Sequence, residues 1–339
     1  MTGGQVSAST SAGPVARSLI ITIDTEGDDL WSRPSEIKVE NARFVPRFQK
    51  LCEVYGMKPV YLTNYEMATC GAFQEFARDG IRRGTAEVGM HLHAWNNPPA
   101  YRLTPDDYAR QPYLIEYPTS VMRDKIAFLT DTLEDVFGTK MLSHRAGRWA
   151  FNGAYASLLL ARGYQSDCSV TPGISWHATK GDPNGQGGSD YRSAPLEAYF
   201  VDPQDVSRPG TSSLLEVPMT IRPCRWAIAD KAREWFRSVR LARRFINSLC
   251  CPATWLRPNG RNLGRLLGVL SWAIGQGRDY VEFMLHSSEL MPGGSPTFAA
   301  ERDIEKLYED MEAFFASAVS MGFVGCTLAE YRKVFQPGR

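Results

Sequence analysis

The sequence predicts an α/β fold built around a parallel β-sheet. Short apolar runs rich in β-branched residues alternate with segments of helical spacing along most of the chain, and this alternation is typical of parallel strands joined by covering helices. Acidic, histidine and arginine residues follow directly after several of the apolar runs. Barrels of this class carry their active sites at the carboxyl ends of the strands. The same pattern therefore predicts an active site at one rim of the sheet.

The individual elements are predicted from residue periodicity. Short apolar or alternating runs predict strands, which we expect at residues 18–23, 57–64, 86–93, 141–147, 164–170 and 280–286. Apolar residues spaced three and four apart predict amphipathic helices, which we expect at residues 41–55, 65–83, 119–137, 152–162 and 299–320. Residues 322–331 are expected to form a closing strand and turn.

One long segment interrupts this alternation. Residues 171–213 are rich in Gly, Pro, Ser and Asp, and a loop of this length is usually a functional lid or disordered. We interpret its first part, residues 171–195, either as a lid over a substrate or as a plain surface excursion. The aromatic and charged residues among its glycines are Trp176, His177, Asp190, Tyr191 and Arg192.

Residues 226–248 are predicted to form a basic helix. The simplest interpretation is a solvated face on a helix that packs against the core. The alternative is a surface for peripheral contact with an anionic membrane or for a phosphorylated substrate. The basic residues lie between positions 231 and 244: Lys231, Arg233, Arg237, Arg240, Arg243 and Arg244.

The overall composition is that of an ordinary globular protein. The chain has 339 residues, of which 43% are apolar and 22% are charged. Lys and Arg number 38 against 37 Asp and Glu, which gives a formal net charge of +1. Without a long basic run, this balance argues against a nucleic-acid partner. No apolar stretch reaches the ~18–20 residues of a membrane-spanning helix, so none is expected.

The cysteines and the N-terminal residues indicate a cytoplasmic protein. The seven cysteines contain no CxxC pair, and their odd number argues against a disulfide framework or a zinc ribbon. Reduced thiols are therefore expected. Residues 1–17 are mostly small and polar without the apolar core of a signal peptide, and we expect a disordered leader there.

Two pairs of potential metal ligands follow predicted strands. Asp24 and Glu26 end the first apolar run, so one could bind a metal while the other takes a proton from water; a solvated turn is the commoner meaning of such a pair. His91 and His93 end another strand, and alternation places both on one face, where they could bind one ion or be paired core or surface histidines. Two histidines and one carboxylate suit a hydrolytic divalent ion.

Two further residues of catalytic type also end strands. Arg145 could pair with a catalytic carboxylate and keep it ionised, or it could form an ordinary structural salt bridge. His286 follows an apolar strand and precedes a Gly- and Pro-containing loop. A histidine in this place is suited to general acid catalysis, although it could merely cap the turn.

Taken in order, these motifs resemble those of the polysaccharide deacetylase family, which has the NodB homology domain and forms carbohydrate esterase family four. The similar segments are ITIDTEG (21–27), EVGMHLHAW (87–95), RAGR (145–148) and LHSSE (285–289). The resemblance spans residues 18–335 and implies a distorted (β/α) barrel of about seven parallel strands. It implies a catalytic domain at 18–339, in which residues 171–280 are an inserted helical and loop region that shapes substrate choice.

The resemblance also implies roles for single residues. Asp24 would be the catalytic base and His286 the acid. Arg145 would tether the base, and the backbone N–H of Arg148 would help to bind the oxyanion. One divalent metal ion is implied, with Zn²⁺ as the first candidate and Co, Ni or Mn as alternatives. Its ligands would be Glu26, His91 and His93.

The second motif departs from the family pattern. The family spaces its histidines four apart, but this chain has Trp95 and Asn97 after His93. Either His93 replaces the second histidine ligand or Asn97 contributes to the metal site. Several residues near the motifs and in the long loop are expected to contact substrate: Trp95, Asn97, Trp149, Trp176, His177 and Tyr191.

The implied activity is metal-dependent hydrolysis of an N-acyl group, foremost acetyl, from an amino sugar or an amino-sugar glycan. Such an enzyme is a hydrolase of carbon–nitrogen bonds other than peptide bonds. One alternative is a deformylase or another amide hydrolase acting on a lipid- or nucleotide-linked sugar. The second is a non-catalytic sugar-binding relative, against which the presence of both Asp24 and His286 argues.

Overall fold

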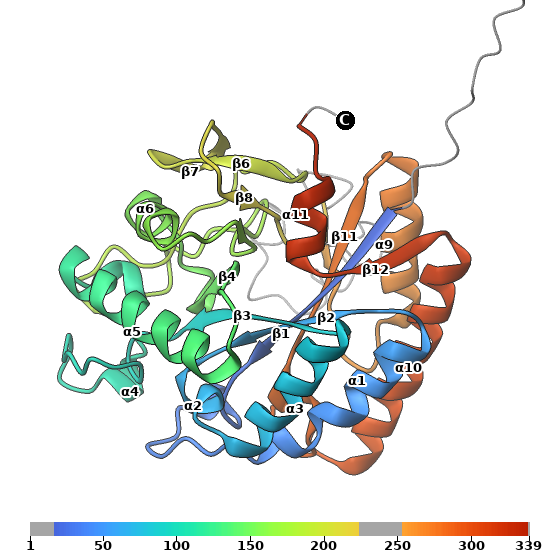
Figure 1. Ribbon diagram of the computed structural model, residues 1–339, viewed down its shortest axis with the longest axis horizontal. Coiled ribbons are helices and arrows are strands. Elements are labelled where there is room, and N and C mark those ends of the chain that lie inside the picture. Colours follow the sequence, from blue (N-terminus) through green and yellow to red (C-terminus); the bar gives the residue numbers. More distant parts are fainter. Residues whose placement is uncertain (1–16, 224–252, 338–339) are drawn as a thin grey trace, which may run out of the picture.

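A curled, mostly parallel sheet forms the centre of the computed structural model, which describes residues 17–223 and 253–337 (Figure 1). The strands in the order β11, β1, β2, β3, β4, β5 and β8 pair in parallel, and β6 and β7 continue the sheet in antiparallel fashion. Their bounds are β1 Arg17–Thr25, β2 Pro59–Thr63, β3 Glu87–Leu92, β4 Ser143–Ala146, β5 Ser166–Asp167, β6 Tyr199–Asp202, β7 Asp205–Pro209, β8 Leu215–Glu216 and β11 Tyr280–His286. The prediction of an α/β barrel fold is confirmed.

β1 pairs with three other strands. It pairs with β11 along one edge, while its other edge pairs first with β12 (Phe323–Cys326) and then with β2. Between β8 and β11 a short antiparallel pair, β9 (Ile221–Arg222) and β10 (Thr254–Trp255), bridges the gap. The Leu256 N–H donates to the Thr220 carbonyl at 2.9 Å, and the Met284 N–H donates to the Leu256 carbonyl at 3.2 Å. The sheet thus forms a distorted barrel rather than a regular closed one.

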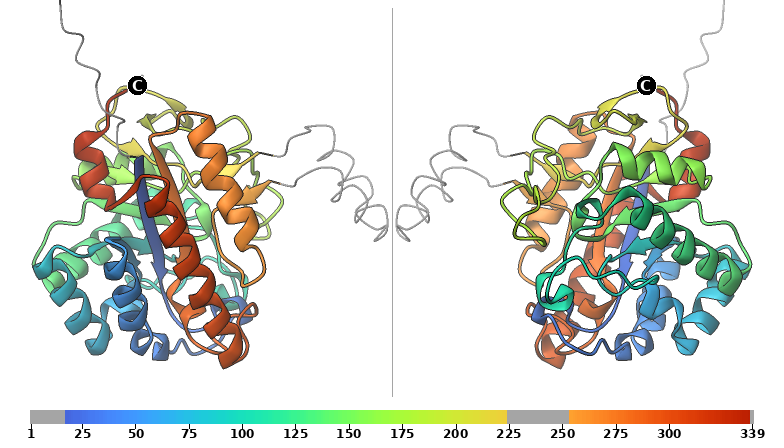
Figure 2. Two further views of the ribbon diagram at one scale, coloured as in Figure 1. Left: turned by 90° about the vertical axis from the view of Figure 1, so that its right-hand side faces the viewer. Right: turned by 90° about the vertical axis from the view of Figure 1, so that its left-hand side faces the viewer.

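The helices cover the outside of the sheet. α9 and α10 lie together beside β11 (Figure 2), and Phe283 of β11 stacks on Phe314 of α10 at a ring separation of 5.1 Å. The α-helices are α1 Val45–Val54, α2 Tyr65–Ala68, α3 Gly71–Arg83, α4 Asp107–Arg110, α5 Thr119–Phe137, α6 Gly153–Ala161, α9 Leu263–Gly275, α10 Glu301–Ser320 and α11 Leu328–Val334. Short 3₁₀ helices span Leu30–Ser32, Glu40–Arg43, Leu114–Glu116, Gly147–Trp149 and Ser287–Leu290.

The structure differs from the sequence-based prediction in several places. The helix expected at 65–83 is divided into α2 and α3, and α11 takes the place of the expected turn after β12. The long loop contains the hairpin β6–β7. Within 171–280, α9 was not predicted, although its buried residues Leu266, Val269, Leu270 and Ala273 have helical spacing. This part of the region belongs to the barrel and its covering layer.

Two further predictions concern the N-terminal leader and the basic helix. Arg17, placed at the end of the expected leader, is the first residue of β1. The predicted basic helix at 226–248, with its proposed membrane contact, lies outside the described residues. In the part of the chain that the structure describes, no helix combines the length and apolar character needed to cross a membrane.

Candidate active site

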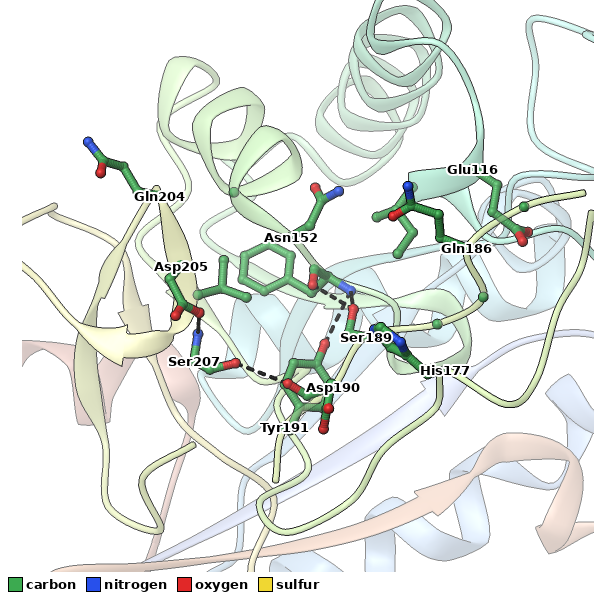
Figure 3. Close-up of a pocket in the computed structure, with 17 residues that line it drawn as sticks. Glu116, Asn152, His177, Gln186, Ser189, Asp190, Tyr191, Gln204, Asp205 and Ser207 are labelled. Carbon is green, nitrogen blue, oxygen red and sulfur yellow. Dashed lines mark hydrogen bonds between the residues drawn. The ribbon is translucent and has the colours of Figure 1, made fainter. Parts of the chain in front are cut away.

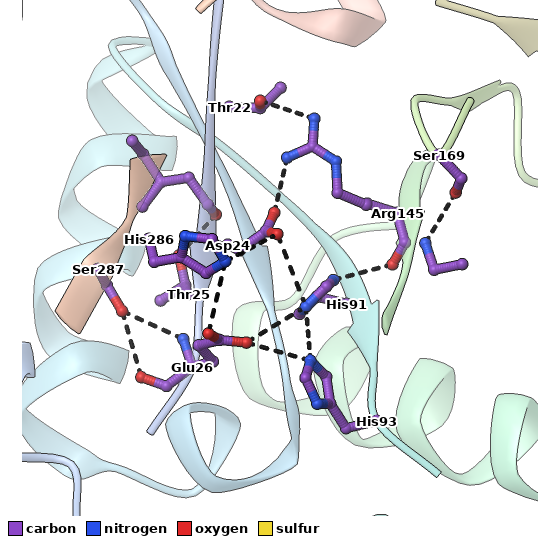
Figure 4. A network of polar contacts seen from close by, with 12 residues as sticks. Thr22, Asp24, Thr25, Glu26, His91, His93, Arg145, Ser169, His286 and Ser287 are labelled. Atoms are coloured by element: carbon purple, nitrogen blue, oxygen red, sulfur yellow. Dashed lines mark hydrogen bonds and ion pairs between the residues drawn. The ribbon is translucent and has the colours of Figure 1, made fainter. Parts of the chain in front are cut away.

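Three potential metal ligands converge at the carboxyl ends of β1 and β3 (Figure 4). Glu26 Oε2 lies 3.4 Å from His91 Nε2 and 3.1 Å from His93 Nε2. The two ring nitrogens are 2.8 Å apart. One ligand atom from each residue lies within 4.8 Å of the others, and all three residues are buried. The geometry could hold one metal ion.

The chemistry of these donors fits a cation. The His91 Nδ1–H donates to the Arg145 carbonyl at 3.0 Å, which leaves the lone pair of neutral His91 on Nε2, the atom that faces Glu26. Fixing the tautomer through the other ring nitrogen is the usual arrangement for a metal-binding histidine. The two Nε2 atoms and the Glu26 carboxylate face one another, and a single proton between the two nitrogens cannot provide a partner for all three groups. A divalent cation bound by all three would provide one.

The charges at the site favour ionised carboxylates. Burial acts to raise the pKa of Glu26, but His286, His91 and His93 outweigh it and hold that pKa well below its usual range. Burial likewise acts to raise the pKa of Asp24, but the Arg145 guanidinium and nearby histidines hold it below its usual value. Both carboxylates are therefore anions near neutral pH, the state that a metal ligand or a base requires.

Arg145 connects Asp24 to a buried carboxyl group that the sequence motifs did not indicate. Its Nη1 donates to Asp24 Oδ1 at 2.6 Å, and its Nη2 donates to Thr22 Oγ1 at 2.8 Å and to Glu282. The Thr22 hydroxyl donates to Glu282 Oε1 at 2.7 Å. One guanidinium thus lies between two carboxyl groups. Burial raises the pKa of Glu282 to about 7, so Asp24 carries the negative charge more readily than Glu282 does.

We expect the free energy of unfolding to depend less on pH in Glu282→Gln than in the wild type. A buried carboxyl group with a raised pKa stabilises the folded state when protonated, so the wild type loses this contribution as pH rises from ~4.5 to about 7. The amide in Glu282→Gln cannot ionise. Urea unfolding of metal-free protein at pH 5 and pH 8 should show a smaller difference in the variant. An unchanged difference would contradict the assignment.

His286 lies opposite Asp24 in the pairing of β1 with β11. Its Nε2 is 3.7 Å from Asp24 Oδ2 and 3.7 Å from Glu26 Oε1, so the ring faces the two carboxylates. Its Nδ1 lies 3.0 Å from Arg257 Nη2 and 3.3 Å from Glu289 Oε2. Arg257 can donate to the neutral ring and Glu289 can accept from the protonated one. The backbone N–H of His286 also donates to Glu289 at 3.0 Å. The hydrogen bond that caps the following 3₁₀ helix is therefore made by the backbone of His286 and does not require its ring.

The RAGR segment (145–148) lies against the end of β3 at Gly147. A Cβ at Gly147 would lie 2.4 Å from the Leu92 carbonyl oxygen and 3.0 Å from His93 Cδ2, so no larger residue fits without movement. The next two residues, Arg148 and Trp149, have left-handed φ values of 56° and 62°. Such conformations are unfavourable for non-glycine residues and are concentrated at functional sites.

A cavity of about 330 Å³ opens beside this network. Of the residues predicted to contact substrate, Trp95, Trp149 and Trp176 line it. Two further aromatic residues there, Trp31 and Tyr113, were not predicted. The remaining lining is Asp24, Glu26, Leu30, His91, His93, Gln111, Arg148, Thr179, Arg257 and His286.

Three predicted substrate contacts do not line this cavity. Asn97 donates from Nδ2 to the Lys125 carbonyl at 3.0 Å and to the carbonyl of its neighbour Pro98. Tyr191 is fully buried and donates to the Trp149 carbonyl at 2.6 Å. His177 borders a different cavity of about 530 Å³, whose polar lining Figure 3 shows. The neighbouring residues Trp176 and His177 thus line different cavities. The conformation of the loop decides this, and local sequence does not specify that conformation.

Two of the residues that were not predicted had a sequence signal. Thr22 lies two residues before Asp24, and Glu282 lies four before His286. Side chains at even spacing along a strand point to the same side, so both could have been placed inside the barrel with Asp24 and His286. Trp31, Tyr113 and Arg257 lie in segments without strand or helical periodicity and had no such signal.

Comparisons with known proteins show the fold. No protein-family model and no curated protein sequence matches the chain. A proposed polysaccharide deacetylase from Mycobacterium smegmatis has a TM-score of 0.50 at 13% identity, covering 96% of this chain and 93% of that one. A proposed glycoside hydrolase/deacetylase from Parabacteroides distasonis has a TM-score of 0.59 at 8% identity, covering 94% and 71%. A GH57-type branching enzyme from Pyrococcus horikoshii has a TM-score of 0.52 at 9% identity, covering 95% and 71%.

The chain therefore has the fold found in polysaccharide deacetylases, as the resemblance implied. The same fold occurs in the branching enzyme, and at these identities likeness of fold does not specify the reaction. The reaction has to be argued from the side chains at the site.

Proposed function

We propose that this protein is a metal-dependent hydrolase that removes an N-acyl group, foremost acetyl, from an amino sugar. One observation carries the proposal: the Glu26–His91–His93 cluster, Asp24 and His286 meet at one cavity. An amide hydrolase requires a base for water, a proton donor for the amine and stabilisation of the oxyanion. This chain offers a residue for each task.

The proposed ligands are Glu26, His91 and His93, and Zn²⁺ is the first candidate for a site with two histidines and one carboxylate. When bound, a divalent cation supplies Lewis-acid polarisation of the acyl carbonyl and acidifies water. Asp24 accepts a proton from the attacking water while Arg145 fixes its carboxylate at 2.6 Å. His286 donates a proton to the departing amine. The backbone N–H of Arg148 is the proposed oxyanion donor.

The aromatic lining supports a sugar as the substrate. Trp31, Trp95, Trp149 and Trp176 line the same cavity as Asp24 and His286. Tryptophan presents a large apolar face together with a polar N–H, which suits the mixed apolar and hydroxyl surface of a sugar ring. Small-molecule sites typically combine such apolar walls with a few placed polar groups.

The proposal is tested by metal analysis followed by product analysis. Purified protein should contain about one divalent metal ion per chain, and metal-loaded protein should release acetate from N-acetylated amino sugars. Formate release from N-formyl sugars, without acetate release, would favour the deformylase alternative. Binding of a sugar without release of either acid would support the non-catalytic alternative. Absence of both metal and hydrolysis would reject the proposal.

We expect His286→Ala to lower kcat by ~10²–10⁴, the usual contribution of general acid catalysis, with little change in bound metal. His177→Ala is the matched control, since His177 borders the separate cavity. Full activity in His286→Ala, or equal loss in His177→Ala, would contradict this role.

A further inference from the structure

The side chain of Arg148 is a cation in the cavity without an acidic partner. Among residues 17–223 and 253–337, no carboxylate lies within salt-bridge distance of its guanidinium, whereas Arg145 is paired with Asp24 and Arg257 with Glu289. The Arg148 guanidinium donates to the Gln111 carbonyl through Nη1 and lies 4.1 Å from the centre of the Tyr113 ring. These contacts hold it in place but give it no salt bridge.

A neighbouring cation adds to the positive charge. Burial and the nearby Arg33 act to lower the pKa of Arg148 and outweigh Tyr113 and Glu116, which act to raise it. Arg33 donates from Nη1 to the Ala109 carbonyl at 2.6 Å. The acid on this side, Glu116, acts on Arg148 through its charge without a salt bridge. Its carboxylate accepts from the backbone N–H groups of Tyr113 at 2.7 Å and of Asp182 at 3.1 Å, and so fixes the loop.

Partly buried charges in proteins are normally paired. A guanidinium offers several N–H donors in a planar fork that matches carboxylate and phosphate groups. Arg148 uses one of these nitrogens for Gln111. It also lines the same cavity as Asp24 and the aromatic wall, so a ligand in this cavity meets both the reacting residues and the unpaired cation.

We propose that Arg148 binds an anionic group of the substrate, a phosphate or a carboxylate, so that the enzyme acts on charged rather than neutral N-acyl amino sugars. This inference rests on the proposed function for the identity of the reaction. The binding of an anion by Arg148 is a separate property that can be measured without turnover. The two can therefore fail independently.

The first experiment measures binding of inorganic phosphate by calorimetry to metal-free protein, since phosphate would also bind a metal ion. Wild type should bind, and Arg148→Gln should bind about 10- to 100-fold more weakly, the effect of losing a charge-assisted hydrogen bond. Arg302→Gln, which removes the same charge from an exposed position of α10, should bind like wild type. Equal binding by wild type and Arg148→Gln, or no binding by wild type, would overturn the inference.

Arg148→Lys separates charge from packing. It keeps the positive charge but loses the planar fork, so its phosphate affinity should lie between those of wild type and Arg148→Gln. If folded Arg148→Lys binds phosphate no better than Arg148→Gln, the positive charge is not what binds the anion and the inference fails. Circular dichroism and thermal denaturation establish that both variants are folded.

The second experiment identifies the kind of anion. N-acetylglucosamine, its 6-phosphate and N-acetylmuramic acid are compared as neutral, phosphate and carboxylate substrates of the metal-loaded enzyme. At least one anionic substrate should have a higher kcat/KM than the neutral one, and this preference should shrink about 10- to 100-fold in Arg148→Gln. A preference for the neutral sugar would overturn the inference while supporting the proposed function. Turnover of none of the three would count against the proposed function and leave phosphate binding to decide the role of Arg148.

Discussion

Replacing His91 with alanine is expected to remove the metal ion and with it the activity. His91 Nε2 lies 3.4 Å from Glu26 Oε2 and 2.8 Å from His93 Nε2, so it is one of only three donors in the cluster that the described residues form. Loss of a residue that merely supports a ligand typically costs 10–100-fold in metal affinity. Loss of a ligand should therefore exceed ~100-fold, and His93→Ala should behave in the same way.

The measurement is metal content after dialysis, together with a titration of Zn²⁺ into the metal-free variants. The fold should survive, because both histidines lie at the rim of the sheet and the large apolar core lies behind it. His177→Ala should retain wild-type metal content, since it removes a histidine that is not part of the cluster. Near-wild-type metal content in either His91→Ala or His93→Ala would refute the assignment.

Replacing Asp24 with asparagine is expected to keep the metal and lower kcat by ~10²–10⁴, the usual size of general base catalysis. The amide can still accept a hydrogen bond from Arg145 but cannot take a proton. The pKa of Asp24 is held below its usual value because Arg145, His91 and His286 outweigh the effect of burial. Asp24 is thus ionised throughout the neutral range, and we expect the acid limb of the wild-type pH–rate profile to lie where Asp24 gains a proton, below the usual pKa of an aspartate.

Asp28→Asn provides the matched control for this prediction. Asp28 follows the same strand, but its carboxylate accepts the backbone N–H groups of Glu40 and Asn41 at 2.9 and 3.0 Å and does not line the cavity. Its replacement should change stability more than turnover. If Asp24→Asn loses its metal, Asp24 is a ligand, and the proposed roles of Asp24 and Glu26 have to be exchanged. Unchanged turnover with metal present would rule it out as the base.

The sequence by itself determined the parallel strands and the residues at their carboxyl ends. Hydrophobic periodicity is a local property, and the two-residue repeat of a strand decides which neighbours share a face. The two-residue spacing of His91 and His93 is therefore enough to place both side chains on one face of the strand, and the same holds for Asp24 and Glu26. Because parallel strands end at one rim, Arg145 and His286 could be assigned to the same rim as well.

Only the tertiary structure decided which partners these residues have. Arg145 and Glu282 are 137 positions apart, and nothing local in either strand specifies that one guanidinium lies between Glu282 and Asp24. The same holds for Trp31 and Arg257 beside His286, and for Asn97, whose Nδ2 donates to the Lys125 carbonyl. Irregular segments lack a repeating pattern, so their side chains are placed by the packing of the whole chain rather than by their own sequence.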